Sequence, residues 1–491
     1  MNDSDRATPT AGPTLDSTAA GKFDSIIIAL AAGIVLGMIW IAQGNMSRTP
    51  DNKPFAHPMH SPNDRSRFVT IRALVDNGTY AIGSIKANGD FVDGSLVKEQ
   101  GWDTIDKVLR PDNQLLYSSK PPLMPTVLAG EYWLLKTASG GRLNFAEHPL
   151  ALVRIIVATA NWLPFVIFLC LFSRLLSRLT SDPWVHLYAL AAAAGGTYLS
   201  GFSVTLNNHT VAAFFMFFAL YPAVLIWCDG RREVWLFALS GCFAAFAAVL
   251  ELPATAFLAA LVVGLGWKSP ARTAAFLLPL AIVPAAAHFY TTYLATGGLS
   301  PAYDKKEWYE FEGSYWKIDR DSGRLVGSSR DEQGKLIIGD PKGIDNQFEP
   351  APVYVFHMLL GHHGVFSLSP IFVFSALGVA RVLADRSHRY WAVALLAAGL
   401  TFVLLIFYTF FAGTRNYGGM TNGLRWFFWL IPLWLVFLPA GLEWKLPSRW
   451  CRPIALVFIA LSAASAFYAS RNPWTRPWLH ELLNQAGWIS Y

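Results

Sequence analysis

The stretch TVAAFFMFFALYPAVLIW, residues 210–227, contains no charged side chain. A helix of this length and composition can cross the hydrocarbon layer of a membrane, which takes about 20 mostly apolar residues. Further stretches of this kind lie at 25–43, 149–172, 184–200, 234–250, 252–267, 273–294, 365–384, 391–411, 425–441 and 453–470. The sequence therefore predicts an all-α polytopic membrane protein with about eleven transmembrane helices.

The composition excludes several other classes of protein. Of the 491 residues, 53% are hydrophobic and 15% are charged, whereas soluble domains carry roughly 25% charged residues. The net charge is +6, but the basic residues sit singly in short connections, where they set membrane orientation, so nucleic-acid binding is not expected. The four cysteines lie in or beside apolar runs without metal-type spacing, which argues against a disulfide framework or a zinc cluster.

The distribution of Lys and Arg predicts the orientation of the helices. Basic residues occupy every second connection, and such connections face the cytoplasm. The intervening connections, and with them the long segments 44–148 and 295–364, are expected to face outward. This alternation requires that PPLMPTVLAGEYWLL, residues 121–135, forms an interfacial or re-entrant helix that does not cross. The basic connections contain Arg174 and Arg178; Arg231 and Arg232; Lys268 and Arg272; Arg381, Arg386 and Arg389; and Lys445, Arg449 and Arg452.

Five regions follow from this topology. They are a cytoplasmic tail at 1–24, a transmembrane core at 25–294 that includes the first outward loop at 44–148, a second large outward loop at 295–364, C-terminal transmembrane helices at 365–470, and an outward tail at 471–491. The first loop contains a helix-like stretch at 65–80. The second contains strand-like stretches, RLVGSS and KLIIGD, which suggest a small β-structured elaboration.

Two residues of the first outward loop are candidates for chemistry. Asp64 precedes the helix-like stretch, where it can cap the helix or act as a general base at the membrane surface. Lys120 is followed by two prolines and a leucine, so that it either extends its ammonium group to the lipid headgroups or binds a phosphate at that depth.

An acidic residue in the first outward loop, a later Lys-Pro-Pro-Leu and many spans together resemble the GT-C superfamily of membrane glycosyltransferases. The nearest branch contains protein mannosyltransferases and lipid A aminoarabinose transferases. There, Asp-Glu-x-x-Tyr precedes Lys-Pro-Pro-Leu. Here the matching stretch has Asp64 in place, but Arg65 replaces the Glu and Phe68 the Tyr. The resemblance implies that Asp64 is the catalytic base and that Lys120 binds the donor phosphate.

The short outward connections supply further candidates. Asn207, Asn208 and His209 interrupt an apolar stretch where the family often has a second acidic residue; they can hold a phosphate or a metal, or cap the next helix. Glu251 is a lone carboxylate between two spans, which is a default functional candidate because such a position is costly.

Two later segments add donors for an anion. His362 and His363 are adjacent, so they point in different directions and do not form a two-nitrogen metal site by themselves, although either can bind a phosphate. Arg415 and Arg425 flank a glycine-rich turn on the outward face, where positive charge is disfavoured. Their fork-shaped donors suit phosphate oxygens, whereas the alternative is that both extend to the headgroups.

These observations predict an inverting glycosyltransferase, active on the outer face of the cytoplasmic membrane. The expected donor is a polyprenyl-phosphate sugar and the expected acceptor is a lipid or a glycan. Asp64 would remove the acceptor proton. Lys120, Arg415, Arg425, His209 and His362 would hold the leaving phosphate. The sequence assigns no particular cofactor, and a divalent metal is compatible with it. The alternative is a polytopic transporter or flippase for an anionic or lipid-linked substrate.

Overall fold

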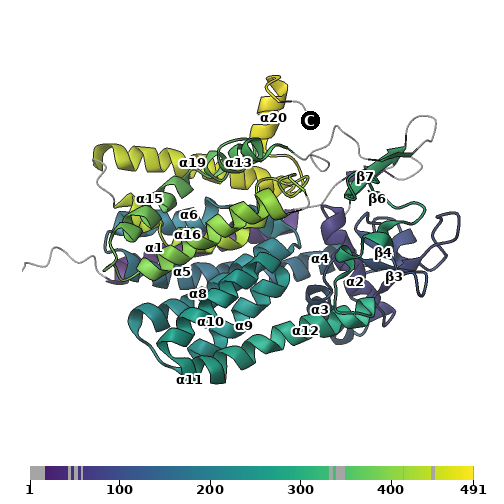
Figure 1. Ribbon diagram of the computed structural model, residues 1–491, viewed down its shortest axis with the longest axis horizontal. Coiled ribbons are helices and arrows are strands. Elements are labelled where there is room, and N and C mark those ends of the chain that lie inside the picture. The colour runs from purple at the N-terminus through teal and green to yellow at the C-terminus, as the bar shows by residue number, and fades with distance from the viewer. Residues whose placement is uncertain are drawn as a thin grey trace, which may run out of the picture.

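Long helices lying side by side make up most of the protein, and short strands gather at one end (Figure 1). The computed structural model describes residues 17–41, 46–48, 54–56, 59–330, 336–338, 349–412, 414–443 and 448–489. Most of the predicted tail at 1–24 and part of the second loop therefore lie outside the described residues, as does Gly413 of the glycine-rich turn.

Six helical segments of the described chain are long and apolar enough to cross a membrane, which confirms the predicted polytopic helical architecture in outline. The segments are Gly21–Ile41, Pro149–Leu179, Asn208–Asp229, Pro270–Thr296, Trp391–Phe411 and Trp450–Arg471. They are formed by α1 (Ser17–Ile41), α4 (Pro149–Val157) with α5 (Leu163–Leu179), α8 (Asn208–Asp229), α11 (Pro270–Arg272) with α12 (Leu278–Thr296), α16 (Trp391–Ile406) and α19 (Ser448–Arg471). Shorter apolar helices are α9 (Val234–Leu250), α10 (Thr255–Lys268) and α15 (Ile371–Ala384).

Two predicted spans are shorter or more broken than the sequence indicates. The stretch 184–200 forms α6 (Pro183–Gly195) and then the single turn α7 (Tyr198–Gly201). The stretch 425–441 is not one helix: a 3₁₀ helix at Arg425–Leu430 is followed by α17 (Ile431–Leu435) and α18 (Leu438–Leu442). Pro432 and Pro439 each lie in the first turn of a new short helix, because proline lacks the N–H that continues the preceding one. The count of eleven spans stays a prediction.

Small residues allow α15 and α18 to cross at very short range. A Cβ atom added to Gly378 would lie 1.9 Å from the carbonyl oxygen of Phe437, and one added to Gly441 would lie 1.8 Å from that of Phe374. Such close backbone approach is typical of membrane helices, which associate through packing because lipid provides no hydrophobic drive.

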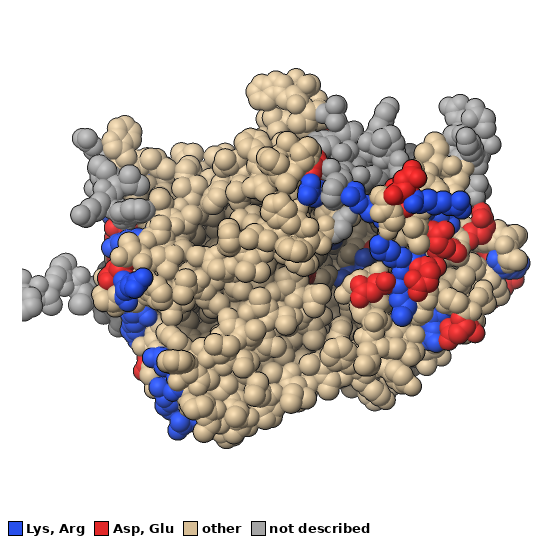
Figure 2. All heavy atoms as spheres, viewed as in Figure 1, with Lys and Arg blue, Asp and Glu red and all other residues tan. Residues whose placement is uncertain are grey.

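Charged side chains lie at the two ends of the molecule and leave an uncharged belt between them (Figure 2). Basic residues dominate at the end that contains α11, whereas the end with the strands carries both signs. The orientation itself, in which the basic connections face the cytoplasm, stays a prediction.

The end with the strands is built from the two large loops. The first loop contains α2 (Pro62–Asp76), a sheet of strand order β3-β5-β4, and α3 (Leu123–Ala138). The sequence analysis missed this sheet because its strands are only three or four residues long: β3 (Ala81–Ser84), β4 (Lys107–Leu109) and β5 (Leu115–Ser118). The first loop also contains the pair β1 (Met46–Arg48) and β2 (Pro54–Ala56).

The second loop contains an antiparallel sheet where strand-like stretches were expected. Its strands are β6 (Trp316–Ile318), β7 (Leu325–Arg330) and β8 (Leu336–Ile338), with Ser328 paired to Ile338. After this sheet come α13 (Ala351–Leu359) and α14 (Val365–Leu368), and the chain ends with α20 (Trp478–Gln485).

Candidate functional site

A cavity of about 830 Å³ lies where both large loops meet the ends of the apolar helices. The first loop, the second loop and the starts of α8 and α10 all contribute to its wall. Its polar lining residues are Asn63, Arg67, Lys120, Asn208, His209, Glu251, Thr255, His288, Tyr303, Asp304, Tyr408 and Arg425. Five of the residues proposed from the sequence are therefore brought together: Lys120, Asn208, His209, Glu251 and Arg425.

Asp64 begins the helix that forms one side of this cavity, but it does not line the cavity. The residue lies in the first turn of α2 and forms a reciprocal capping box with Ser61. Its Oδ1 accepts hydrogen bonds from the backbone N–H groups of Ser61 and Arg65, at 2.7 and 3.0 Å, and its Oδ2 accepts one from the N–H of His60 at 2.8 Å. The structure therefore realises the capping role.

A side-chain contact extends this network toward the cavity. Thr205 Oγ1 donates to Asp64 Oδ2 at 2.9 Å and accepts a hydrogen bond from Trp474 Nε1 at 3.1 Å. The guanidinium carbon of Arg425 lies 4.8 Å from the centre of the Trp474 ring, within the range of a cation–π contact. Asp64 thus supports the position of Arg425 through two intermediate side chains.

Arg67 lies one turn after Asp64 on α2 and does face the cavity. Its Nη1 donates to the carbonyl oxygen of Asn63 at 2.8 Å, and its Nη2 donates to Asn208 Oδ1 at 2.6 Å. Burial lowers the pKa of Arg67 to about 10, against the opposing effect of Asp106. The sequence analysis did not single out this arginine.

Lys120 follows β5 and approaches the cavity from the other side of the first loop. Its Nζ lies 3.0 Å from Asp106 Oδ2. Burial lowers the pKa of Lys120, while Asp106 opposes that effect. Ser118 Oγ accepts a hydrogen bond from the Lys120 N–H at 3.1 Å, which fixes the turn that leads to the two prolines.

The positive charges of the cavity act on one another. Arg425 lowers the pKa of both Arg67 and Lys120, and Arg67 also lowers that of Lys120, in addition to the larger effect of burial. Grouping like charges away from water costs free energy. A bound anion would remove that cost, so the arrangement is suited to a phosphate.

Glu251 is held at the border of the cavity by the start of α8. Asn208 Nδ2 donates to Glu251 Oε1 and, at 3.1 Å, to the carbonyl oxygen of Leu250. His209 Nδ1 lies close to the same carboxylate oxygen. Asn207, by contrast, caps α8: its Oδ1 accepts from the Thr210 N–H at 2.8 Å, and it does not line the cavity.

Asp304, on the second large loop, is a second carboxylate of the cavity and was not found from the sequence. It is exposed, and no side-chain hydrogen bond to it is found among the described residues. Although the residue is exposed, partial removal of water from around its carboxyl group raises its pKa above the ordinary aspartate value, while Lys305 opposes this effect. No sequence signal distinguishes it, because it stands in an ordinary turn after Pro301 and becomes notable only through its place in the fold.

One side of the cavity is apolar and exposed. Leu252, Phe289 and Leu299 line it, with 69%, 49% and 62% of their surfaces exposed. Leu252 precedes α10 and Phe289 lies on α12. Because α10 and α12 are both apolar helices, this side of the cavity faces the lipid.

The remaining sequence candidates lie elsewhere. Arg415 is separated from Arg425: its Nε and Nη1 donate to the carbonyl oxygens of Thr409 and Glu349, both at 2.8 Å, so the two arginines do not form one clamp. His362 and His363 are buried beside Tyr417, outside the cavity. His362 instead belongs to a group with Glu349 and His357 that could hold a metal ion.

Comparison with solved structures finds several that are similar to this chain at low sequence identity. ArnT from Cupriavidus metallidurans bound to undecaprenyl phosphate has 13% identity and a TM-score of 0.47, over 91% of this chain and 64% of that one. The apo form of ArnT has 12% identity and a TM-score of 0.47, over 93% and 76%. The Archaeoglobus fulgidus oligosaccharyltransferase in the apo form has 14% identity and a TM-score of 0.46, over 94% and 57%.

No family model and no curated protein matches the sequence. The chain spans less than two thirds of the length of ArnT bound to undecaprenyl phosphate and of the oligosaccharyltransferase. At these identities and TM-scores, the similarities assign neither a family nor an activity to the chain.

Proposed function

We propose that the protein is a membrane glycosyltransferase that moves a sugar from a polyprenyl-phosphate-linked donor to an acceptor on the outer side of the membrane. The grouping of Arg67, Lys120 and Arg425 around one cavity carries the proposal, because three cationic side chains there suit the phosphate of such a donor. The cavity lies at the ends of apolar helices, a position that suits a phosphate joined to a lipid.

An apolar groove supports a lipid-linked donor. It has a volume of about 470 Å³, lies between α8, α10 and α16, and is lined by Leu220, Trp227, Leu261, Val263, Leu396 and Val403, among others. Residues near the start of α10 line both spaces: Thr255 and Leu258 line the cavity, whereas Ala256 and Ala260 line the groove. A polyprenyl chain in this groove would place its phosphate near the cations.

The chemistry requires a proton acceptor that the substrate can reach. The acceptor hydroxyl attacks the anomeric carbon, its proton passes to a carboxylate, and the phosphate leaves with the electrons of the broken bond. Asp304 fits this role better than Asp64, because the oxygens of Asp64 are used by the capping network. Lys120, Arg67 and Arg425 stabilise the leaving phosphate.

Sugar transfer by the purified full-length protein in lipid nanodiscs, with a synthetic polyprenyl-phosphate sugar, tests the proposal. We expect Lys120→Met to reduce donor binding at least tenfold because it removes the charge and keeps the length of the side chain. Lys86→Met is the matched control, since Lys86 is exposed on the same loop. Movement of intact donor across the bilayer without transfer would favour the flippase alternative.

The orientation has its own test. Reporter fusions after Arg231 and after Gly323 are expected to report the cytoplasm and the outer side, respectively. The reverse result would place both large loops and the cavity in the cytoplasm and would contradict the proposed outward activity.

A further inference from the structure

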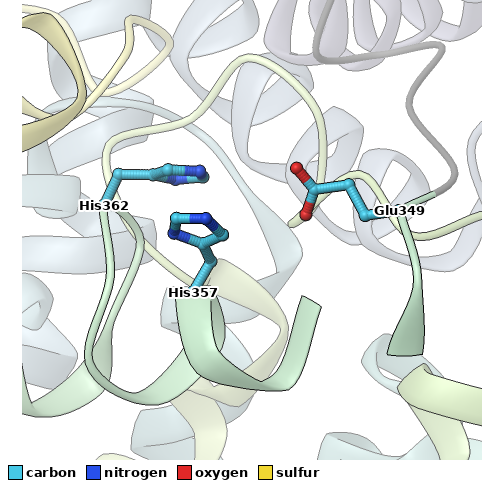
Figure 3. Close-up of side chains that lie close together, drawn as sticks. All are labelled: Glu349, His357 and His362. Carbon is cyan, nitrogen blue, oxygen red and sulfur yellow. The ribbon is translucent and has the colours of Figure 1, made fainter. Parts of the chain in front are cut away.

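Three side chains near the start and end of α13 bring their polar atoms together outside the cavity. Glu349 lies just before the helix, His357 lies within it, and His362 follows it. One carboxylate oxygen and one nitrogen from each ring lie within 4.8 Å of one another. Figure 3 shows the two rings one above the other, with the carboxylate of Glu349 facing their edges.

Contacts around the group orient its members. His362 Nδ1 lies 2.5 Å from His363 Nδ1, so one of these two nitrogens donates a hydrogen bond to the other. The hydroxyl of Tyr417 donates to Glu349 Oε2. Metal-binding histidines and carboxylates usually have such partners, which fix the orientation of the ligand and its tautomer.

One ring nitrogen of the group is not used by the protein. Nδ1 of His357 is buried and has no hydrogen-bond partner in the described part of the chain, so the protein groups around it leave this polar atom unsatisfied.

We propose that Glu349, His357 and His362 bind one divalent transition-metal ion of the Zn²⁺ type. Two imidazole nitrogens and one carboxylate oxygen form a ligand set that zinc accepts, and water or Tyr417 can complete four-fold coordination. Ca²⁺ and Mg²⁺ are disfavoured because they require mainly oxygen ligands. Glu349 and His357 are half-buried, so the ion can reach the group from solvent.

The site would also order the glycine-rich turn that leads to the cavity. Tyr417 contacts Glu349 and packs against His362, with ring centres 4.9 Å apart. The next residue, Gly418, has φ of +96°, and a Cβ atom there would lie 3.0 Å from Arg425 Nε. The metal thus fixes the glycine-rich turn, which packs against Arg425 of the cavity. The role of the metal is therefore structural.

Metal binding by the purified full-length protein tests this inference independently of sugar transfer. After treatment with a chelator, the protein is dialysed against Zn²⁺, and its metal content is measured by mass spectrometry. We expect one Zn²⁺ per wild-type chain and at least a tenfold weaker affinity in Glu349→Gln and in His362→Ala. His148→Ala is the control, because His148 is exposed and distant in sequence.

Thermal unfolding of the wild-type protein covers the case in which a ligand variant does not fold. Zn²⁺ should raise its unfolding temperature, whereas Mg²⁺ at the same concentration should not. Equal zinc content in the wild type and in both folded ligand variants, or the absence of a thermal shift in the wild type, would overturn the proposal. Lys120→Met should keep its zinc, so that a failure of the proposed transfer reaction remains distinguishable.

Discussion

Arg67 Nη2 donates a 2.6 Å hydrogen bond to Asn208 Oδ1, although the two residues are 141 positions apart in the chain. Asn208 in turn donates to Glu251. A cation of the first large loop is therefore linked to a carboxylate at the end of α9 through the side-chain amide of Asn208. This amide accepts a hydrogen bond from Arg67 and donates one to Glu251. The predictions below depend on this cavity and on the helices that support it.

Asp64 is expected to act through stability. Replacing it with alanine removes the acceptor for several buried N–H groups and for Thr205, and we expect the free energy of unfolding to fall by about 1 to 3 kcal/mol. Asp64→Asn should also destabilise the folded protein, because the NH₂ group of the new amide would face one of these N–H or O–H donors and cannot accept its hydrogen bond. Transfer per folded molecule should change less than tenfold. Asp321→Ala, at an exposed position, is the control. A stable Asp64→Asn protein whose transfer falls by about 10²- to 10⁴-fold would restore Asp64 as the base.

Asp304→Asn is expected to keep donor binding and to lower the transfer rate by about 10²- to 10⁴-fold, the range for loss of a general base. Partial removal of water raises the pKa of Asp304, so its carboxylate should become protonated at a higher pH than an ordinary aspartate does. The wild-type enzyme should therefore lose its ionised base at that higher pH as the solution is acidified. The acidic decline in kcat/KM should disappear in the variant. Glu307→Gln, on the same loop, controls for the loss of charge. An unchanged pH profile would contradict the assignment.

Arg425→Lys keeps the charge but loses the planar group that lies over Trp474. We expect donor affinity to fall by about 2- to 30-fold, which corresponds to a cation–π contact of 0.5 to 2 kcal/mol. Binding of a labelled polyprenyl phosphate to the protein in nanodiscs provides the measurement. Arg320→Lys, at an exposed position in the second loop, should bind like the wild type. Equal affinities for both variants would remove Arg425 from the phosphate site.

Gly378→Ala tests the crossing of α15 and α18. Its added methyl group would collide with the carbonyl oxygen of Phe437, so we expect a loss of about 1 to 3 kcal/mol from overpacking and a lower unfolding temperature in detergent. Gly33→Ala in α1 is the matched control, because a Cβ atom there meets nothing within 4 Å. A thermal stability equal to that of the control would show that the two helices can separate at little cost.

The sequence was sufficient to predict features that depend on a local pattern. Uninterrupted apolar runs identified the long helices, and Lys120, Arg425, His209 and Glu251 were found because polar residues stand out at the ends of such runs. The break at 425–441 was missed because the run is apolar throughout, so that its prolines alone carried the signal.

The other site residues depend on tertiary structure. Arg67 and Asp64 share a helix, but only the fold directs the arginine into the cavity and the carboxylate into the capping box. Asp304 gains its environment from helices distant in sequence. Glu349 and His357 were missed as partners of His362 for a similar reason, since the turn after α13 folds that histidine back onto the helix.

The exposed apolar side of the cavity, formed by Leu252, Phe289 and Leu299, has a consequence for enzyme kinetics. A lipid-linked substrate that arrives through this side comes by lateral diffusion within one leaflet. The rate then depends on the mole fraction of the substrate among the surrounding lipids rather than on its amount per volume of solution. Diluting the substrate with inert phospholipid should slow the reaction even when the total quantities of enzyme and substrate are unchanged.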